Sequence, residues 1–351
     1  MKRICVFVGS RANYSSIKSV MRAAQKHPDC ELQVIAAASA LLDRYGAVVD
    51  LIEDDGFPVQ ARVHMLVEGE TPHTMAKSTG LGLMELPTIF DYLKPDVVIT
   101  IGDRFETVAT AVAAAFMNIP LAHTMGGEVT GTIDESIRHA VTKFAHIHFP
   151  ASRDAADRIL RLGETPDSIH IVGCPRMDLV RDILEDGNDW AKNDSLRSGV
   201  GDPVDLDKPF LIVSQHPVTT EYGAGQAQIT ATLEAVRETG LPAIVLWPNA
   251  DAGSEDISRG IRIWRERGLA DNMHFFKNLP ISVYIQLMAR TACLIGNSSS
   301  GIRDGAFIGT PSVNIGTRQV GRERGHNVID VEHERGEGEE ELEFQIRWSH
   351  E

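Results

Sequence analysis

The sequence of 351 residues predicts an α/β protein with two Rossmann-like, doubly wound domains and a central cleft between them. Apolar, β-branched runs alternate with helical stretches such as 14–25 and 105–117. The alternation stops at a polar segment rich in Gly, Asp and Asn, and then starts again. Apolar strands separated by helices indicate parallel sheets covered on both faces. We therefore expect domains at 1–184 and 210–351, joined by a linker at 185–209.

The expected strands are short runs of five to seven residues, bounded by turn signals. In the first domain they are Arg3–Val8, Glu31–Ala37, Asp96–Gly102, Ile119–Thr124, His146–Pro150 and Ile169–Gly173. In the second domain they are Phe210–Gln215, Pro242–Pro248, Met273–Asn278, Cys293–Ser298 and Pro311–Gly316. Ligands of such sheets bind beyond the carboxyl ends of the strands, so the residues directly after each run are the functional candidates.

Composition narrows the possible partners. The net charge of −15 argues against a nucleic-acid surface. Part of that charge lies in the tail Ile329–Glu351, where nine acidic residues and two arginines leave −7, which is typical of a solvated end or a fraying helix. No window approaches 18 consecutive apolar residues and no leader precedes the first strand, so we expect a cytoplasmic protein that does not enter a membrane. The four cysteines are scattered, which favours reduced thiols.

Polar residues follow six of the expected strands. They are Arg11 and Ser15 beyond a glycine turn, Asp103 with Arg104, His216, Asn249, the loop Asn297–Gly301, and Arg318. The glycine turn and the serine-rich loop suit an anion such as a diphosphate, because backbone N–H groups and hydroxyls can donate to it. A single polar residue after a strand often has only a structural role. Polar residues after six strands are harder to explain as helix caps alone. No Walker A, GxGxxG, HExxH or Cys/His cluster is present, which disfavours P-loop hydrolysis, dinucleotide chemistry and structural zinc.

The stretch AHTMGGEVTGTIDESIRHA allows two interpretations. In the structural one, Thr132 and Glu135 form a capping box, Asp134 lies in a first helical turn that favours negative charge, and Arg138 makes an ordinary surface pair with these acids. That interpretation leaves Gly126–Gly127 unexplained, since adjacent glycines allow the backbone to approach something closely. In the functional interpretation the same first turn also faces a substrate.

The sequence resembles the hydrolysing UDP-N-acetylglucosamine 2-epimerase family, especially its sialic and legionaminic acid branch. The resemblance is carried by GSRANYS, GDRFE, GGEVTGTIDESIRHAVTKFAHIHF, GCPRMD, QHPVTT, PNADAGS, GNSSSGIRDGAF and GTPSVNIGTRQVGRERG. It implies a glycosyltransferase-B-like fold with the nucleotide held mostly by the second domain. It also implies anti elimination of UDP, hydration of the resulting glucal to N-acetylmannosamine, no metal or redox cofactor, and a homodimer.

The resemblance also implies roles for individual residues. The nucleotide and its phosphates would be held by Arg11, Ser15, Arg104, Asn249, Leu279, Ser298, Ser299, Asp304 and Arg318. The sugar and the catalysis would fall to Asp103, Asp134, Glu135, Arg138, His216 and Glu128, with His216 facing the diphosphate. Such groups suit the chemistry, because removing a sugar C2 proton requires a positioned base and expelling a diphosphate requires donors where negative charge develops.

Three positions depart from the family pattern. Met125 stands where the family usually has a glutamate, and a thioether cannot transfer a proton, so Glu128 and Glu135 become the candidates to compensate. Ala40 replaces a histidine commonly found near the sugar. Asp304 replaces a glutamate that meets the ribose and is one methylene shorter.

These departures leave alternatives open. One is a nucleotide-sugar glycosyltransferase or hydrolase that does not invert C2, and another is a nucleotide-sugar-binding protein without catalysis. The base, UDP or GDP, and the substituents of the sugar also stay open. Arg259 and Arg262 fall where an animal relative binds its end product, although two arginines on a helix are more often plain surface charges.

Overall fold

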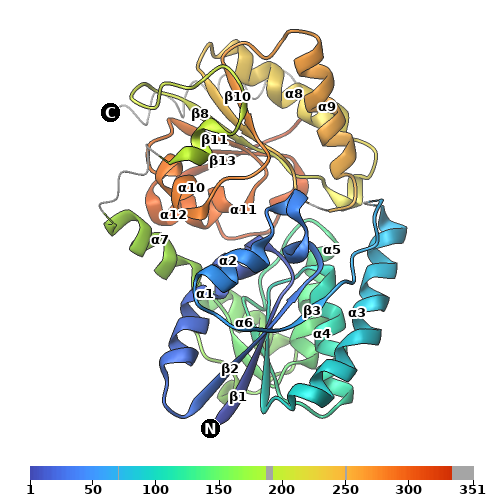
Figure 1. Ribbon diagram of the computed structural model, residues 1–351. Helices are drawn as coiled ribbons and strands as arrows, with labels where there is room; N and C mark the ends of the chain where they lie inside the picture. The colour runs from blue at the N-terminus through green and yellow to red at the C-terminus, as the bar shows by residue number, and fades with distance from the viewer. Residues whose placement is uncertain (70, 187–192, 250, 334–351) are drawn as a thin grey trace. The chain divides into compact units, whose positions relative to one another are not determined.

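The computed structural model describes residues 1–69, 71–186, 193–249 and 251–333. The chain forms two compact units. The first comprises Met1–Val129 and Ile133–Leu179, and the second comprises Thr130–Thr132 and Val180–Glu351. Each unit is built on a mainly parallel sheet, so the predicted fold class of two Rossmann-like α/β halves is confirmed (Figure 1).

The sheet of the first unit is entirely parallel, with strand order β3-β2-β1-β4-β5-β6. The strands are β1 (Lys2–Val8), β2 (Cys30–Ala37), β3 (Val59–Val63), β4 (Val97–Ile101), β5 (Leu121–Thr124) and β6 (Ile147–Phe149). The strand order reverses between β1 and β4. Loops that follow these two strands therefore diverge, which is where ligands of open α/β sheets bind.

Helices cover both faces of this sheet. They are α1 (Arg11–Lys26), α2 (Val48–Asp54), α3 (Pro72–Leu93), α4 (Phe105–Phe116), α5 (Ile133–Phe144) and α6 (Arg153–Arg161), followed by α7 (Arg176–Glu185), which ends in the second unit. Alternate residues of β1 point to opposite faces, as the period of a strand requires. Cys5 and Phe7 pack with α3 and α4, whereas Val6 and Val8 pack with α1 and α2.

The second unit has the strand order β13-β12-β11-β8-β9-β10-β7, parallel except for β7. The strands are β7 (Val200–Gly201), β8 (Leu211–Ser214), β9 (Ala243–Leu246), β10 (Met273–Phe276), β11 (Cys293–Gly296), β12 (Ser312–Ile315) and β13 (Val328–Val331). The helices are α8 (Gly225–Glu238), α9 (Ser254–Glu266), α10 (Ile281–Met288), α11 (Ser299–Ile302) and α12 (Asp304–Ile308). Here the order reverses between β11 and β8.

One expected strand is wrong. Of Ile169–Gly173, only Ile169 makes a β-bridge, to His148. Ile171 and Val172 are 46% and 56% exposed, so their apolar side chains do not enter a core. Three observed strands, β3, β7 and β13, were not predicted from the sequence. The segment expected as a linker contains β7, and the expected acidic tail begins inside β13, while 334–351 lie outside the described residues.

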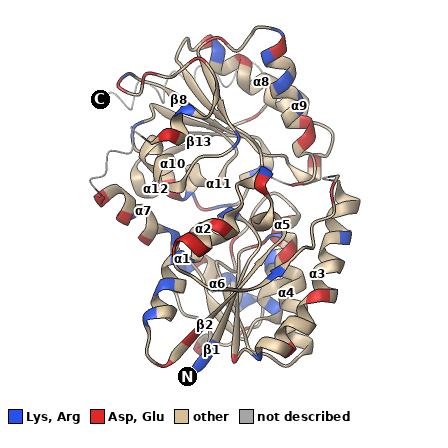
Figure 2. Ribbon diagram, viewed as in Figure 1, with Lys and Arg blue, Asp and Glu red and all other residues tan. Residues whose placement is uncertain are grey.

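Charged side chains of both signs are spread over the helices, with acidic residues visible on α2 and α7 (Figure 2). All four cysteines are free thiols. Cys5 and Cys293 are buried, and burial raises the pKa of each to about 12. Among the described residues, no helix combines the length and the apolar character that crossing a membrane requires.

Candidate functional site

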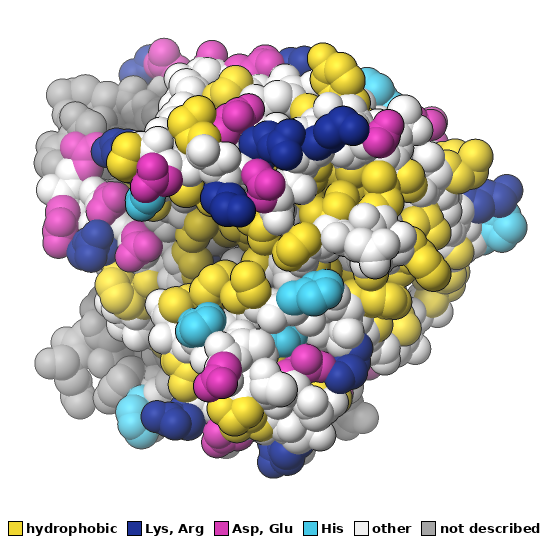
Figure 3. All heavy atoms as spheres, turned by 90° about the horizontal axis from the view of Figure 1, so that it is seen from below, with side chains coloured by type: hydrophobic (Ala, Val, Ile, Leu, Met, Phe, Trp, Pro, Cys, Tyr) yellow, Lys and Arg dark blue, Asp and Glu magenta, His cyan; other side chains and the backbone are white. Residues whose placement is uncertain are grey.

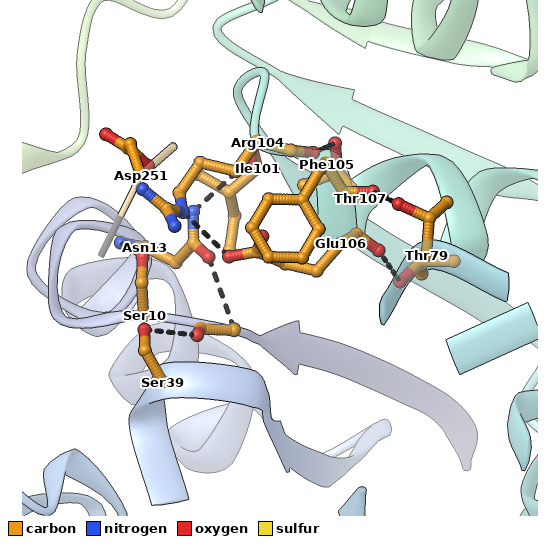
Figure 4. Close-up of polar contacts among 12 residues, drawn as sticks. Ser10, Asn13, Ser39, Thr79, Ile101, Arg104, Phe105, Glu106, Thr107 and Asp251 are labelled. Atoms are coloured by element: carbon orange, nitrogen blue, oxygen red, sulfur yellow. Dashed lines mark hydrogen bonds and ion pairs between the residues drawn. The ribbon is translucent and has the colours of Figure 1, made fainter. Parts of the chain in front are cut away.

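Hydrogen bonds with Asn13 and Ser39 hold the glycine turn after β1 (Figure 4). Its Gly9 N–H donates to Asn13 Oδ1 at 3.2 Å, and its carbonyl accepts from Ser39 Oγ at 3.0 Å. A side chain at Gly9 would collide with the buried Glu106, since a Cβ would lie 2.5 Å from its Cγ. The same carboxylate accepts from Arg104 Nε at 2.8 Å, so a buried acid orients the Arg104 side chain.

The partly exposed Asp103 pairs with the buried Arg138. Arg138 has no exposed surface, and its guanidinium contacts the Asp103 carboxylate while Nη1 donates to the Glu128 carbonyl at 2.8 Å. The arginine thereby connects the loop after β4, the loop after β5 that contains Gly126 and Gly127, and α5. The expectation of an ordinary surface pair for Arg138 is wrong, because burial of a guanidinium demands a close charged partner.

The first turn of α5 carries the two remaining acids predicted for the sugar. Asp134 and Glu135 are both partly exposed, and Asp134 lies one helical turn before Arg138 on the same face. Glu135 is 3.9 Å from His139 Nε2, on the next turn. Five acidic or basic predictions of the first unit therefore lie on two loops and one helix: Asp103 after β4, Glu128 after β5, and Asp134, Glu135 and Arg138 on α5. The capping box at Thr132 stays a prediction.

His123 was missed by the sequence analysis, although it helps to place Asp103. Its Nε2 lies 2.7 Å from the carbonyl of Gly102, which can only accept, so this nitrogen carries the proton and Nδ1 accepts from Thr142 Oγ1 at 3.2 Å. Burial lowers the pKa of His123 to about 4, so the ring is neutral. It supports Gly102, whose φ of +71° forms the turn before Asp103. A lone histidine in an apolar strand was its only sequence signal.

The glycine pair after β5 approaches the protein itself. A Cβ on Gly126 would lie 2.8 Å from His123 Nδ1, and one on Gly127 would lie 2.2 Å from the carbonyl oxygen of Ala155. Gly127 also has φ of +77°, and its own carbonyl accepts from Arg158 Nη1 at 2.6 Å. Close packing against α5 and α6 therefore explains these glycines without a ligand.

Met125 and Ala40, two of the three departures from the family pattern, are buried. Met125 is 5% exposed and has a left-handed backbone with φ of +61°, a conformation that costs a side-chain-bearing residue about 1 kcal/mol. Its N–H is fixed by the carbonyl of Phe149 at 2.9 Å. Ala40 is fully buried in the short helix after β2, and its N–H donates to the carbonyl of Gly9. Both positions therefore adjoin the loops that carry the predicted site residues.

In the second unit, His216 is held by two neighbouring loops. Asn297, after β11, exchanges two hydrogen bonds with the His216 backbone, at 2.7 and 2.9 Å. The N–H of Asn249, after β9, donates to His216 Nδ1 at 3.1 Å. Because Nδ1 accepts, the neutral ring carries its proton on Nε2. The imidazole is therefore oriented as an Nε2–H donor.

Arg318 and the serine loop lie around the same asparagine. Arg318 Nη1 donates to the Asn297 carbonyl at 3.2 Å, and Nη2 lies 3.9 Å from Asp251. Ser298 and Ser299 are partly exposed at the start of α11, while the Ser298 hydroxyl caps Ser300 N–H. The predicted residues His216, Asn249, Ser298, Ser299 and Arg318 thus follow four strands of one sheet, β8, β9, β11 and β12.

Of the remaining predicted positions, two are buried and two lie on the exposed surface of α9. Leu279 lies after β10 and is buried, and Asp304 is buried at the start of α12. Arg259 and Arg262 are exposed on α9, and Arg262 pairs with Glu255 on the same helix. The geometry gives these two arginines the ordinary surface role.

Comparisons with known proteins identify the family of the chain. A protein-family model described as UDP-N-acetylglucosamine 2-epimerase matches residues 22–345. The UDP-N,N'-diacetylbacillosamine 2-epimerase (hydrolyzing) of Legionella pneumophila is 32% identical over 332 residues, covering 95% of this chain and 85% of that protein. The GDP/UDP-N,N'-diacetylbacillosamine 2-epimerase (hydrolyzing) of Campylobacter jejuni is 31% identical over 333 residues, covering 94% and 84%.

The fold also matches a solved structure. The crystal structure of UDP-GlcNAc 2-epimerase from Neisseria meningitidis bound to UDP-GlcNAc superposes with a TM-score of 0.77 at 17% identity, covering 91% of this chain and 84% of that one. At this identity the likeness shows the architecture, while the family model and the closer sequence relatives carry the assignment. The resemblance of the motifs is confirmed: this chain belongs to the UDP-N-acetylglucosamine 2-epimerase family.

Proposed function

We propose that this protein is a hydrolysing 2-epimerase that converts UDP-N-acetylglucosamine, or a diacetamido relative, into the 2-epimeric free sugar and UDP. A base removes the C2 proton, the electron pair of that bond forms a C1–C2 double bond, and the bond from C1 to the diphosphate oxygen breaks. Water then adds to the glucal, with a proton going to C2 from the opposite face and hydroxide to C1. The names of the Legionella and Campylobacter relatives favour the hydrolysing reaction and the diacetamido sugar.

The observation that carries the proposal is the ion pair between the buried Arg138 and the partly exposed Asp103. The guanidinium holds the Asp103 carboxylate in a fixed position, and we assign this carboxylate as the base that accepts the C2 proton. Asp134 and Glu135, on the adjoining turn of α5, supply the further carboxyl group that protonation of C2 requires. In this proposal Glu128 or Glu135 performs the proton transfer that Met125 cannot.

The second unit supplies the donors for the leaving group. His216 offers Nε2–H, Ser298 and Ser299 offer hydroxyls, and Arg318 offers a guanidinium. Donors that are already oriented stabilise charge developing on a departing oxygen without reorganisation. We propose that Asn249, Leu279 and Asp304 hold the nucleoside, and that Arg11 and Arg104 reach the phosphates.

The test is turnover of UDP-N-acetylglucosamine in deuterated water, followed by proton NMR. A released mannosamine-type sugar with deuterium at C2 is the expected result. Release of UDP with unlabelled glucosamine would instead support a transferase or hydrolase without inversion, and saturable binding without turnover would support a binding protein. Parallel reactions with the diacetamido substrate and with GDP-linked sugars identify the preferred substrate.

We also propose a homodimer. Leu81, Met84 and Tyr92 lie on one face of α3, and Met84 and Tyr92 are 74% and 83% exposed, with Phe116 at the end of α4 82% exposed. Figure 3, which views the molecule from below, shows hydrophobic side chains gathered on the side where α3 lies in Figure 1. An apolar helix face of this kind is typical of an interface.

Light scattering should give twice the monomer mass for the wild type. It should give the monomer mass for a Met84→Lys, Tyr92→Lys variant, because two ammonium groups cannot be buried in a self-complementary interface. A monomeric wild type would rule out the dimer. A cytoplasmic location is part of the same proposal and agrees with four free thiols.

A further inference from the structure

The segment GCPR, Gly173–Arg176, packs on one face of α1. The carbonyl of Pro175 accepts from Ser19 Oγ at 3.1 Å, and Arg176 Nη1 donates to Ser15 Oγ. Ser15 and Ser19 are one turn apart on the same helix face, and Arg11 is one turn before Ser15. The two serines therefore hold Arg176 on the stripe of α1 that begins with Arg11.

Arg11 and Arg176 lie close enough for their charges to interact. Burial first, and then the charge of Arg176, lower the pKa of Arg11 to about 10, so both groups stay cationic at neutral pH. Within the described part of the chain, the buried Nη1 of Arg11 has no hydrogen-bond partner. A buried donor without an acceptor costs about 1–3 kcal/mol, and a neighbouring like charge adds to that cost. An anion with several acceptor oxygens would relieve both.

We propose that Arg176 is a second phosphate-binding cation, which acts with Arg11 on the diphosphate of the nucleotide. This inference rests on the proposed function and adds a residue that the motif comparison did not place in the site. Two guanidinium groups match the charge of a diphosphate better than that of a single carboxylate, and planar guanidinium groups pair well with phosphate oxygens.

The inference changes the role expected for Ser15. Its hydroxyl hydrogen donates to the carbonyl of Ala12 at 3.1 Å, and its oxygen accepts from Arg176. Both functions of the hydroxyl are therefore used within the protein. Ser15 acts as a positioning residue that holds Arg176, and the contact with phosphate belongs to the two arginines.

The experiment measures binding of UDP, uridine and pyrophosphate by calorimetry to wild type, Arg176→Met and Arg176→Lys. Arg176→Met should weaken UDP and pyrophosphate about 10- to 100-fold, as loss of a charged hydrogen bond predicts, and leave uridine unchanged. Arg176→Lys should recover part of the loss, because it restores the charge without the planar fork. The matched control is Arg181→Met, an exposed arginine on the same helix paired with Asp182, which should bind like wild type.

The outcomes separate this inference from the proposed function. Wild-type affinity for UDP in Arg176→Met, or an equal loss for uridine, would overturn the role of Arg176. If the wild type binds no UDP, the proposed function fails, and pyrophosphate binding by wild type and Arg176→Met still decides the arginine pair. If Arg176→Met does not fold, Ser15→Ala replaces it, with an expected loss of about threefold or more for UDP and none for uridine.

Discussion

Arg138, on α5, and Asp103, after β4, form an ion pair whose cation has no exposed surface. The pair joins two elements that are separate in the sequence, and it fixes the carboxylate beside the first turn of α5. Removing one partner of such a pair leaves the other charge buried, which is more damaging than replacing both.

Asp103→Asn should abolish exchange at the sugar C2 and lower the free energy of unfolding by about 3 kcal/mol, because Arg138 loses its counter-charge. Adding Arg138→Met should restore much of the stability but none of the exchange. Urea unfolding and NMR in deuterated water measure the two effects, with Asp182→Asn, in an exposed pair, as the control. Wild-type exchange in Asp103→Asn would remove this residue from the mechanism.

His216→Ala should slow UDP release about 100-fold, since a donor oriented toward the leaving group is lost. His216→Gln should retain more activity, because its amide nitrogen can occupy the place of Nε2. Steady-state kinetics with a coupled UDP assay distinguish the two variants, and His27→Gln, at an exposed histidine, serves as the control. Equal activity of the alanine variant and the wild type would contradict a role in leaving-group stabilisation.

Met125→Glu should raise kcat, because a carboxyl group at this position can transfer a proton and a thioether cannot. Met125→Gln, which has a similar shape but no titratable group, should not. The measurement is kcat for both variants at several pH values. An unchanged rate in Met125→Glu would show that Glu128 or Glu135 compensates fully for the missing glutamate, and would contradict a cost of the thioether at this position.

Gly127→Ala should destabilise the protein by at least 2 kcal/mol more than Gly163→Ala. Both glycines have a left-handed backbone, but a Cβ at Gly127 meets the Ala155 carbonyl at 2.2 Å, whereas nothing lies within 4 Å of one at Gly163. The control therefore isolates the backbone cost of about 1 kcal/mol from the collision. Similar unfolding midpoints and m-values for the two variants would show that the loop moves away without penalty.

The stability of the protein should fall as the pH is lowered from 6.5 to 4, in part because of His123. Its pKa is lowered from 6.5 to about 4 by burial, so in this range the unfolded chain binds a proton that the folded protein excludes. The contribution is complete above pH 6.5 and its loss amounts to about 3 kcal/mol. Urea titrations of wild type and His123→Asn test this, since the variant should show a shallower decline. Identical slopes would refute it.

The sequence predicted the strands that are buried on both faces. It did not predict a strand with polar residues, and it wrongly indicated a strand where apolar residues are exposed. Val59–Val63 reads VQARV and was missed, because its exposed polar residues Gln60 and Arg62 interrupt the apolar run. Ile169–Gly173 is apolar yet exposed, so hydrophobicity alone misled the assignment. Two-residue β7 is too short to leave a periodic signal.

The candidate site was predictable as a set of strand ends, but not in its supporting contacts. Arg138 looked like a surface partner of nearby acids, and only the fold brings Asp103 to it. Glu106 lies in GDRFE and His123 in AHTMGGEVTGTIDESIRHA, but neither stretch indicates that these side chains support the loops from within. Gly126–Gly127 signalled close approach correctly, while the sequence could not say that the neighbour is α5 and α6.

The paired hydrogen bonds between the His216 backbone and Asn297 have a practical consequence for inhibitor design. A compound that turns the imidazole aside must break its bond with the Asn249 N–H, and the two backbone bonds to Asn297 keep the main chain from following, so induced fit is costly at this point. Compounds whose acceptor atoms match the existing direction of Nε2–H should therefore gain more affinity than bulkier compounds that require the loop to rearrange.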